Sequence, residues 1–299
     1  MWLISGTIPE EDFPLNYGSV WEDSRVEGDR LVLPGGKAIP IARGTAALSA
    51  AAILACGALG APAPRLLLVG DTGKGDGSRA AYKWLAENLG EVLRKMPDLK
   101  GLTFHYFYPD SDWHNRVLMA VDELDPRPIV VADAGFMYVA KMSGYARSYD
   151  LFTPDLGELA FLADEKAPHP FYTRGFLLAE DKDMPLLFKR ALEHSNCPPN
   201  MIVKGKADYI ICDDKLVATV SEPSEAAMEC IGGTGDVVTG LATAWLASGA
   251  PICRSALCAA RAARLLAAEC HPIPATQVAE LIAEIPATIK KWREEIEKD

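Results

Sequence analysis

The stretch "ECIGGTGDVVTG", Glu229 to Gly240, places Asp236 among glycines and runs directly into an apolar helical pattern. Its apolar residues recur at helical spacing, at Val237, Val238, Leu241, Ala244 and Trp245. This spacing predicts a helix that begins at about Thr234 to Asp236 and buries one face in a core. A carboxylate at such a helix start is either an ordinary cap or a base aimed at a ligand in the turn.

The glycines before and beside Asp236 favour a binding function. A plain cap needs one Ser, Thr or Asp, whereas Gly232, Gly233 and Gly235 leave the N–H groups of the first helical turn uncovered. Uncovered N–H groups at the positive end of a helix dipole form an anion hole. If a phosphoryl group lies there, Asp236 stands where a hydroxyl nucleophile must lose its proton. We therefore predict that Asp236 is a general base.

Continuous apolar runs elsewhere in the chain predict buried strands. They are "RLLLVG" (65–70), "LTFHYFY" (102–108), "PIVVAD" (128–133) and "NMIVKG" (200–205). Helical patterns lie between these runs, so we expect a mainly parallel sheet with helices on both faces. The chain then forms one α/β domain over residues 1–299. Residues 1–44 are expected to be an irregular segment packed on it, in which "LVLPGGKAIPI" forms short strands or a hairpin.

Ligands of such sheets bind beyond the carboxyl ends of the strands. The suggestive residues that follow strand patterns are Gly73, Asp133, Asp155 and Lys204. The loop "GDTGKGDGS" (70–78) is not a Walker A loop, because Lys74 is followed by glycine and not by Ser or Thr. It is either a long surface turn or a flexible turn whose N–H groups suit an anion or a flat ligand.

The segment "TPDLGE" (153–158) has two interpretations. Asp155 and Glu158 have the spacing of a capping box at a helix start. Beyond a strand end, the same two carboxylates can hold magnesium or its waters next to phosphates. Lys204 is likewise either a solvated charge at a strand end or the cation that a phosphate site needs.

Composition excludes several classes of protein. The net charge of −11 and the pI of about 5.0 argue against a nucleic-acid footprint. The longest apolar run, from Thr45, is rich in Ala and Gly and too short for a confident membrane span. The first residues lack a charged n-region and soon turn acidic, so we do not expect them to be a signal peptide. The seven cysteines lack a C-x-x-C motif, which predicts a cytoplasmic protein without a zinc site or a disulfide framework. Among the histidines, His105 and His114 are the candidates to line a pocket.

The stretch "GGTGDVVTGLATAWLASG" resembles the G-x-G-D motif and following helix of the ribokinase-like superfamily. "TPDLGE", "VKG" and "AAMECIGGTGD" resemble motifs of its ADP/ATP-dependent NAD(P)H-hydrate dehydratases. The resemblance covers roughly residues 65–292 and implies a three-layer αβα fold and a homo-oligomer. It also implies a reaction in which ATP or ADP phosphorylates the hydroxyl of hydrated NADH or NADPH, after which phosphate is eliminated.

Motif matching assigns each role to a position in this chain. Asp236 would be the base, and the anion hole would consist of Gly232, Gly233, Thr234 and Gly235. The adenine nucleotide would be lined by Lys204, Gly205, Lys206, Ala207 and Asp208. The substrate would contact Asp155, Asp133 and Gly73, and Glu158 would bind Mg²⁺ directly or through water.

The chain departs from the dehydratase pattern at two positions. Asp155 stands where that family has His, and its D-A-D motif is reduced here to Asp133. Two alternatives therefore remain, a kinase for a vitamin precursor or sugar, and a catalytically silent nucleotide-binding protein. The intact G-T-G-D argues against the silent protein, and Asp236 argues against the pyrimidine-type vitamin kinases, which usually carry Cys there.

Overall fold

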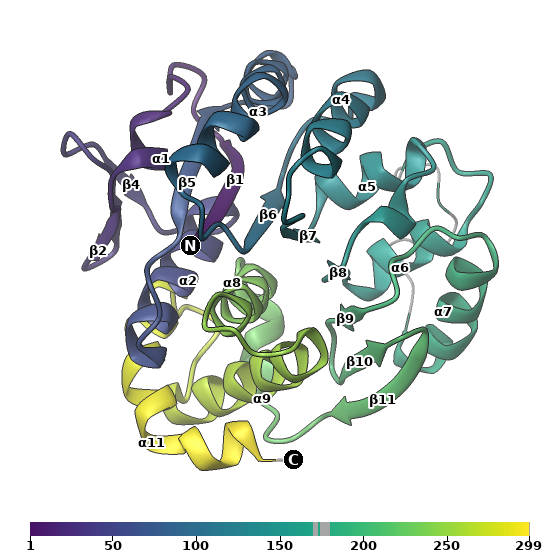
Figure 1. Ribbon diagram of the computed structural model, residues 1–299. Coiled ribbons are helices and arrows are strands. Elements are labelled where there is room, and N and C mark those ends of the chain that lie inside the picture. The colour runs from purple at the N-terminus through teal and green to yellow at the C-terminus, as the bar shows by residue number, and fades with distance from the viewer. Residues whose placement is uncertain (170–172, 174–179, 299) are drawn as a thin grey trace.

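The computed structural model describes residues 1–169, 173 and 180–298, and its central element is a β-sheet (Figure 1). Within these residues the sheet has the strand order β11-β10-β9-β8-β7-β6-β1-β5. Its strands are β1 (Trp2–Ile8), β5 (Arg65–Gly70), β6 (Gly101–His105), β7 (Ile129–Ala132), β8 (Leu151–Phe152), β9 (Met201–Val203), β10 (Asp208–Cys212) and β11 (Lys215–Val220). The pairs from β5 through β9 are parallel, while β9-β10 and β10-β11 are antiparallel. The mainly parallel α/β sheet is thus confirmed.

Helices cover both faces of the sheet (Figure 1). One face packs against α2 (Thr45–Leu59), α8 (Thr234–Ala247), α9 (Ile252–Cys270), α10 (Val278–Ala283) and α11 (Ile285–Glu297). The other face packs against α3 (Asp76–Lys95), α4 (Ser111–Asp122), α5 (Gly135–Met142), α6 (Leu156–Ala163) and α7 (Met184–Glu193). Shorter helices are α1 (Gly18–Trp21), η1 (Ala146–Ser148), η3 (Asp181–Asp183) and η4 (Ala226–Cys230). Because an apolar core lies on each face of the sheet, the central strands carry apolar side chains on both faces.

The first residues of the chain form a central strand, so the prediction of an irregular segment is wrong for residues 2–8. β1 lies between β5 and β6 and pairs parallel with both. A Cβ on its Gly6 would lie 2.5 Å from the carbonyl oxygen of His105, so only glycine allows the two backbones to approach this closely. The predicted hairpin in "LVLPGGKAIPI" is confirmed. It joins β3 (Arg30–Val32) to β4 (Ala38–Pro40) in a small sheet with β2 (Arg25–Glu27).

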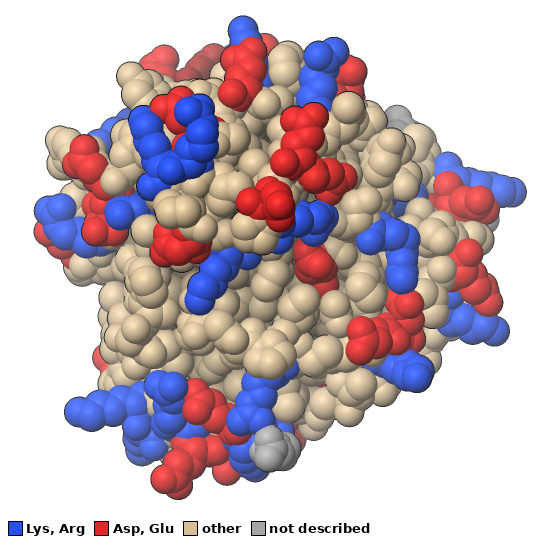
Figure 2. Space-filling model, in the orientation of Figure 1, with Lys and Arg blue, Asp and Glu red and all other residues tan. Residues whose placement is uncertain are grey.

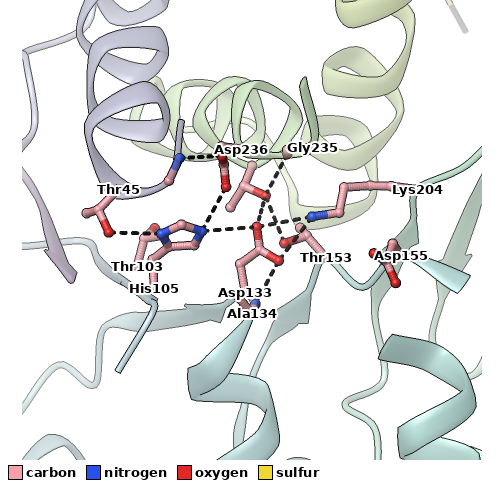
Figure 3. Close-up of polar contacts among 12 residues, drawn as sticks. Thr45, Thr103, His105, Asp133, Ala134, Thr153, Asp155, Lys204, Gly235 and Asp236 are labelled. Carbon is pink, nitrogen blue, oxygen red and sulfur yellow. Dashed lines mark hydrogen bonds and ion pairs between the residues drawn. The ribbon is translucent and has the colours of Figure 1, made fainter. Parts of the chain in front are cut away.

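The Ala-rich segment from Thr45 is a buried helix, α2, as predicted. It packs closely on α8, where a Cβ on Gly240 would lie 2.5 Å from the carbonyl oxygen of Leu48. No helix in the described part of the chain has the length and apolarity needed to cross a membrane. The close contact of α2 and α8 brings the starts of these two helices to the same edge of the sheet (Figure 3).

A disulfide joins Cys212 at the end of β10 to Cys253 in α9, with their Cα atoms 5.8 Å apart. The prediction that the chain has no disulfide is therefore wrong for this pair. The two cysteines are separated by 41 residues and belong to no spacing motif. Only the return of α9 along the sheet brings them together.

Candidate active site

A cavity of about 760 Å³ lies beyond the carboxyl ends of the strands, within the size range of small-molecule sites. Its wall contains these residues that the sequence predicts for the site: Asp133, Asp155, Glu158, Lys204, Gly205, Lys206, Asp208, Gly233, Thr234, Gly235 and Asp236. The cavity also extends along α9, past Ala263, Arg264 and Ala267. The structure thus brings the predicted base, anion hole and nucleotide loop together around one space.

Three predicted site residues lie outside the cavity wall. Gly232 precedes the wall residue Gly233, and Ala207 turns its N–H toward the carboxylate of Asp181 at 3.5 Å. Gly73 lies in a loop that closes on Asp71, whose Oδ1 accepts hydrogen bonds from the N–H groups of Gly73 and Gly75. These internal bonds give the loop its shape without a ligand, and a substrate role for Gly73 stays a prediction.

The start of α8 has the open form that the sequence predicts. Gly233 is the N-cap residue with φ of +98°, and no side chain caps the helix within the described residues. A Cβ on Gly233 would lie 3.1 Å from Cα of Arg43, and one on Gly235 would lie 3.4 Å from Nζ of Lys204. Because both positions are glycines, Arg43 and Lys204 can lie close to the uncapped N–H groups. Such a site suits an anion.

Asp236 does not cap its own helix (Figure 3). Its Oδ2 accepts a hydrogen bond from the N–H of Gly44 at 2.6 Å, and its Oδ1 lies 3.0 Å from Nε2 of His105. Its residue surface is 9 % exposed, in the cavity wall. Burial alone would raise the pKa of this carboxyl, but His105, Lys204 and Gly44 outweigh burial and hold the pKa below its usual range. Asp236 is thus an ionised carboxylate able to accept a proton.

Lys204 supplies the cation beside the anion hole. Its Nζ lies 3.0 and 3.1 Å from the two carboxylate oxygens of Asp133. Burial would lower the pKa of Lys204, but Asp133, Glu158 and Asp236 outweigh it and raise the pKa, so the lysine stays charged. Asp133 also accepts a hydrogen bond from Thr239 at 2.6 Å. Asp133 therefore holds Lys204 in place in the cavity wall and also binds Thr239.

Asp155 and Glu158 form the capping box that the sequence suggested. Each backbone N–H donates to the other's carboxylate, at 2.7 Å to Asp155 and 2.9 Å to Glu158. Tyr138 donates its hydroxyl hydrogen to the second oxygen of Glu158 at 2.8 Å. Burial, followed by the nearby charge of Asp155, raises the pKa of Glu158 to about 8. Both carboxylates also line the cavity, so the capping and cation-binding interpretations are compatible.

The contribution of residues 43–45 was not predicted from the sequence, and His105 was predicted only as a candidate to line a pocket. The predicted strand over 102–108 ends at His105, because Tyr106 adopts a φ of +50° and leaves the extended conformation. His105 therefore follows an apolar strand at the ligand edge, as Asp133 and Lys204 do. That position was the available signal. His114, by contrast, is buried against Tyr149 and lies outside the cavity wall.

The fold defines the class of protein first, an α/β protein of the ribokinase-like fold. A ribokinase-like superfamily protein from Enterococcus faecalis aligns over 97 % of this chain and 87 % of its own, with a TM-score of 0.58 and 11 % identity. A Cryptococcus neoformans ribokinase in complex with ADP aligns over 97 % and 99 %, with a TM-score of 0.53 and 13 % identity. At such low identity the likeness establishes the fold alone.

Sequence comparison then establishes the family. The family model described as NAD(P)H-hydrate dehydratase matches residues 111–287. An uncharacterised protein of Methanocaldococcus jannaschii is 35 % identical over 227 residues, which cover 76 % of this chain and 91 % of the relative. The chain belongs to the NAD(P)H-hydrate dehydratase family, which is a family of enzymes.

Proposed function

We propose that this protein uses ATP or ADP to phosphorylate the hydroxyl of hydrated NADH or NADPH and then eliminates phosphate to restore the dihydronicotinamide. Family membership supports this reaction. The observation that carries it is Asp236, an ionised and almost fully buried carboxylate in the first turn of an uncapped helix, on the wall of the cavity. A base and an anion hole on the same helical turn are what hydroxyl phosphorylation needs.

The first step is phosphoryl transfer. Asp236 accepts the proton of the substrate hydroxyl while that oxygen forms a bond to the terminal phosphorus. The bond between this phosphorus and its bridging oxygen breaks, and the nucleotide leaves with the electron pair, as ADP from ATP or as AMP from ADP. The N–H groups at the start of α8 and the ammonium of Lys204 stabilise the charge on the transferred group.

The second step is elimination. Phosphate leaves the ring carbon with the electron pair of the C–O bond, and the neighbouring carbon gives a proton to solvent water, so that the electron pair of its C–H bond forms the double bond of the ring. The same helix start and Lys204 face the departing phosphate and favour its charge. The net reaction consumes one nucleotide phosphoanhydride bond and removes the elements of water from the substrate.

Magnesium fits the carboxylates at the start of α6. Asp155 and Glu158 offer oxygen donors in the cavity wall. Burial and the charge of Asp155 outweigh the charge of Lys204 and raise the pKa of Glu158, so a further cation beside these carboxylates would favour the ionised form of Glu158. These two residues would hold Mg²⁺ directly or through water. When bound, Mg²⁺ would neutralise nucleotide phosphate charge.

The test is recovery of dihydronicotinamide absorbance from hydrated NADH, with Mg²⁺ and either ATP or ADP, alongside a measurement of released phosphate. Wild type should restore the absorbance with one donor and release phosphate. Asp236→Asn should bind the nucleotide with unchanged affinity and lose activity by at least about 10²-fold, because general-base catalysis contributes about 10²- to 10⁴-fold.

Asp112→Asn serves as the matched control, because it makes the same chemical change at an exposed carboxylate on α4, outside the cavity wall. This variant should keep wild-type activity. An Asp236→Asn protein that is as active as the control would remove the assigned role of Asp236. A wild-type protein that binds nucleotide but restores no absorbance would refute the proposed dehydration.

A small-molecule kinase is the second candidate, and Asp155 favours it. This residue is exposed at the cavity, at the position where the dehydratases resembled by the sequence carry His. A kinase would retain phosphate on its product, whereas a dehydratase would release it. Mass analysis of products from a panel of vitamin precursors and sugars, with free phosphate measured in parallel, separates the two reactions.

A further inference from the structure

His105 connects the carboxylate of Asp236 to the start of α2 (Figure 3). Its Nε2 lies 3.0 Å from Oδ1 of Asp236, and its Nδ1 lies 3.0 Å from the hydroxyl oxygen of Thr45. The ring is fully buried. The N–H of Gly44, one residue before Thr45, donates to Oδ2 of Asp236 at 2.6 Å. Oδ2 is therefore hydrogen-bonded from outside the helix, and Oδ1 lies within ion-pair distance of the ring of His105, which is also outside the helix.

The partners of the His105 ring decide where it carries hydrogen. Nε2 lies 3.0 Å from a carboxylate oxygen of Asp236 and 3.8 Å from one of Asp133. Ionised carboxylates only accept hydrogen bonds, so Nε2 must carry a hydrogen. The hydroxyl of Thr45 can donate or accept, and it therefore satisfies Nδ1 in either protonation state.

We propose that His105 is a positioning residue for the base: through Nε2 it fixes the orientation of Asp236, and Thr45 in turn fixes the orientation of His105. The role in turnover rests on the proposed function, but the contacts of His105 with Thr45 and Asp236 do not depend on which acceptor is used. A base must lie within hydrogen-bond reach of the proton that it accepts. Without the histidine, Oδ1 loses its partner and the carboxylate gains rotational freedom.

A metal ion bound to the same side chains is the competing explanation. His105, Asp133 and Asp236 each place one potential ligand atom within 4.8 Å of the others. The ammonium of Lys204, however, lies 3.0 Å from Asp133 and would repel a second cation. A metal would also require the lone pair of Nε2, whereas the contact with Asp236 requires an N–H there. The geometry therefore favours a hydrogen-bonded cluster.

Removal of His105 should change the pH dependence of activity. The charged or titratable groups that face Asp236 are His105 at the end of β6, Tyr106 after it, Asp133 after β7 and Lys204 after β9. A donor to a carboxylate stabilises its ionised form, so removal of His105 should raise the pKa of Asp236. The acid limb of the activity profile should then move to higher pH.

The decisive measurement is a ¹³C NMR titration of the Asp236 carboxyl in full-length protein labelled at aspartate, with the signal assigned by its loss in Asp236→Asn. In His105→Leu the midpoint should rise by about one pH unit or more, since the ring donor is gone. In His105→Gln, whose amide can donate to the same oxygen, it should stay near the wild-type value. A midpoint unchanged in His105→Leu would overturn the proposal.

Kinetics on hydrated NADH provide the second readout. His105→Leu should lower kcat by about 10- to 100-fold, the range typical when an orienting partner is lost. The KM for the nucleotide should remain unchanged, and His105→Gln should recover most of kcat. If wild type converts no hydrated NADH, the proposed function fails, while the NMR titration still decides the role of His105.

Thr45→Val tests the proposal even if the His105→Leu protein does not fold. This variant removes the hydroxyl partner of Nδ1, keeps a similar shape, and leaves His105 and Asp236 in place. It should shift the midpoint and kcat in the same direction as His105→Leu, by a smaller amount, and no shift would contradict the proposal. A titration that changes when a chelator is added would support the metal explanation and overturn ours.

Discussion

At the scale of the residue, the site consists of buried charges that compensate one another. Asp133 is 1 % exposed and accepts hydrogen bonds from Lys204, from Thr239 and from the N–H of Ala134. Lys204 meanwhile lines the cavity with its charge intact. We therefore expect the pair to contribute separately to the stability of the fold and to affinity for an anion.

Lys204→Met separates these properties. It preserves most of the side-chain volume but leaves the carboxylate of Asp133 buried without its cation. Breaking a buried pair in this way should lower the free energy of unfolding by about 3 to 5 kcal/mol. Denaturant unfolding measures this loss, and calorimetric titration with ADP should show weaker binding.

The double variant Lys204→Met with Asp133→Asn is the control for this prediction. The neutral amide no longer needs a cation, so this protein should recover much of the lost stability while ADP binding stays weak. Recovery of both properties, or wild-type affinity in the single variant, would show that Lys204 does not act on the nucleotide.

At the scale of the element, the site depends on how closely α2 and α8 approach. Thr45 begins α2, and Asp236 lies in the first turn of α8. A Cβ on Gly240 would lie 2.5 Å from the carbonyl oxygen of Leu48 and 2.8 Å from Cβ of Ala51. The separation of α2 and α8 thus sets the distance between Asp236 and the N–H of Gly44, the residue before α2.

Gly240→Ala should force the two helices apart. Because the obstructing atoms include backbone, we expect a loss of stability of about 1 to 3 kcal/mol, as for overpacked cores, together with reduced turnover. Gly90→Ala is the matched control, since a Cβ on Gly90 in α3 meets nothing within 4 Å. That change should be neutral or stabilise by up to about 1 kcal/mol. Equal effects of the two substitutions on thermal unfolding would refute the packing argument.

At the scale of the whole molecule, acidic residues outnumber basic ones, 41 to 30. On the face drawn in Figure 2, acidic and basic side chains are interspersed. The ionisable groups whose pKa values shift furthest from their usual values are buried. One of them, His114, lies away from the cavity wall, and burial lowers its pKa to about 4.

His114 makes the stability of the whole fold depend on pH. The unfolded chain binds a proton here below pH 6.5, whereas the folded protein resists protonation until about pH 4. The contribution of His114 is therefore fully present above pH 6.5 and is lost as the pH falls toward 4, by about 3 kcal/mol in total. Urea unfolding from pH 7.5 to 5 should show a steeper loss in wild type than in His114→Gln. Parallel curves would contradict this assignment.

Much of the fold could be predicted from the sequence because parallel strands leave an unambiguous local pattern. The strands β5, β7 and β9 are continuous apolar runs, and the start of α8 at Thr234 follows from helical spacing and glycines. β1 was missed because its short run "WLISGTI" contains a glycine and polar residues and stands alone at the start of the chain. Its place in the centre of the sheet depends on partners far away in sequence.

The sequence by itself determined the class of fold, the family motifs and the choice of Asp236 as the candidate base. Each of these depends on residue types and spacing within a short segment of the chain. Only the tertiary structure decided what holds Asp236. His105 at a strand end and Gly44 in a loop contact it directly, and the charges of Asp133 and Lys204 lie nearby, all over long sequence separations. Such contacts leave no periodic signal, since they arise when the sheet forms and α2 packs against α8.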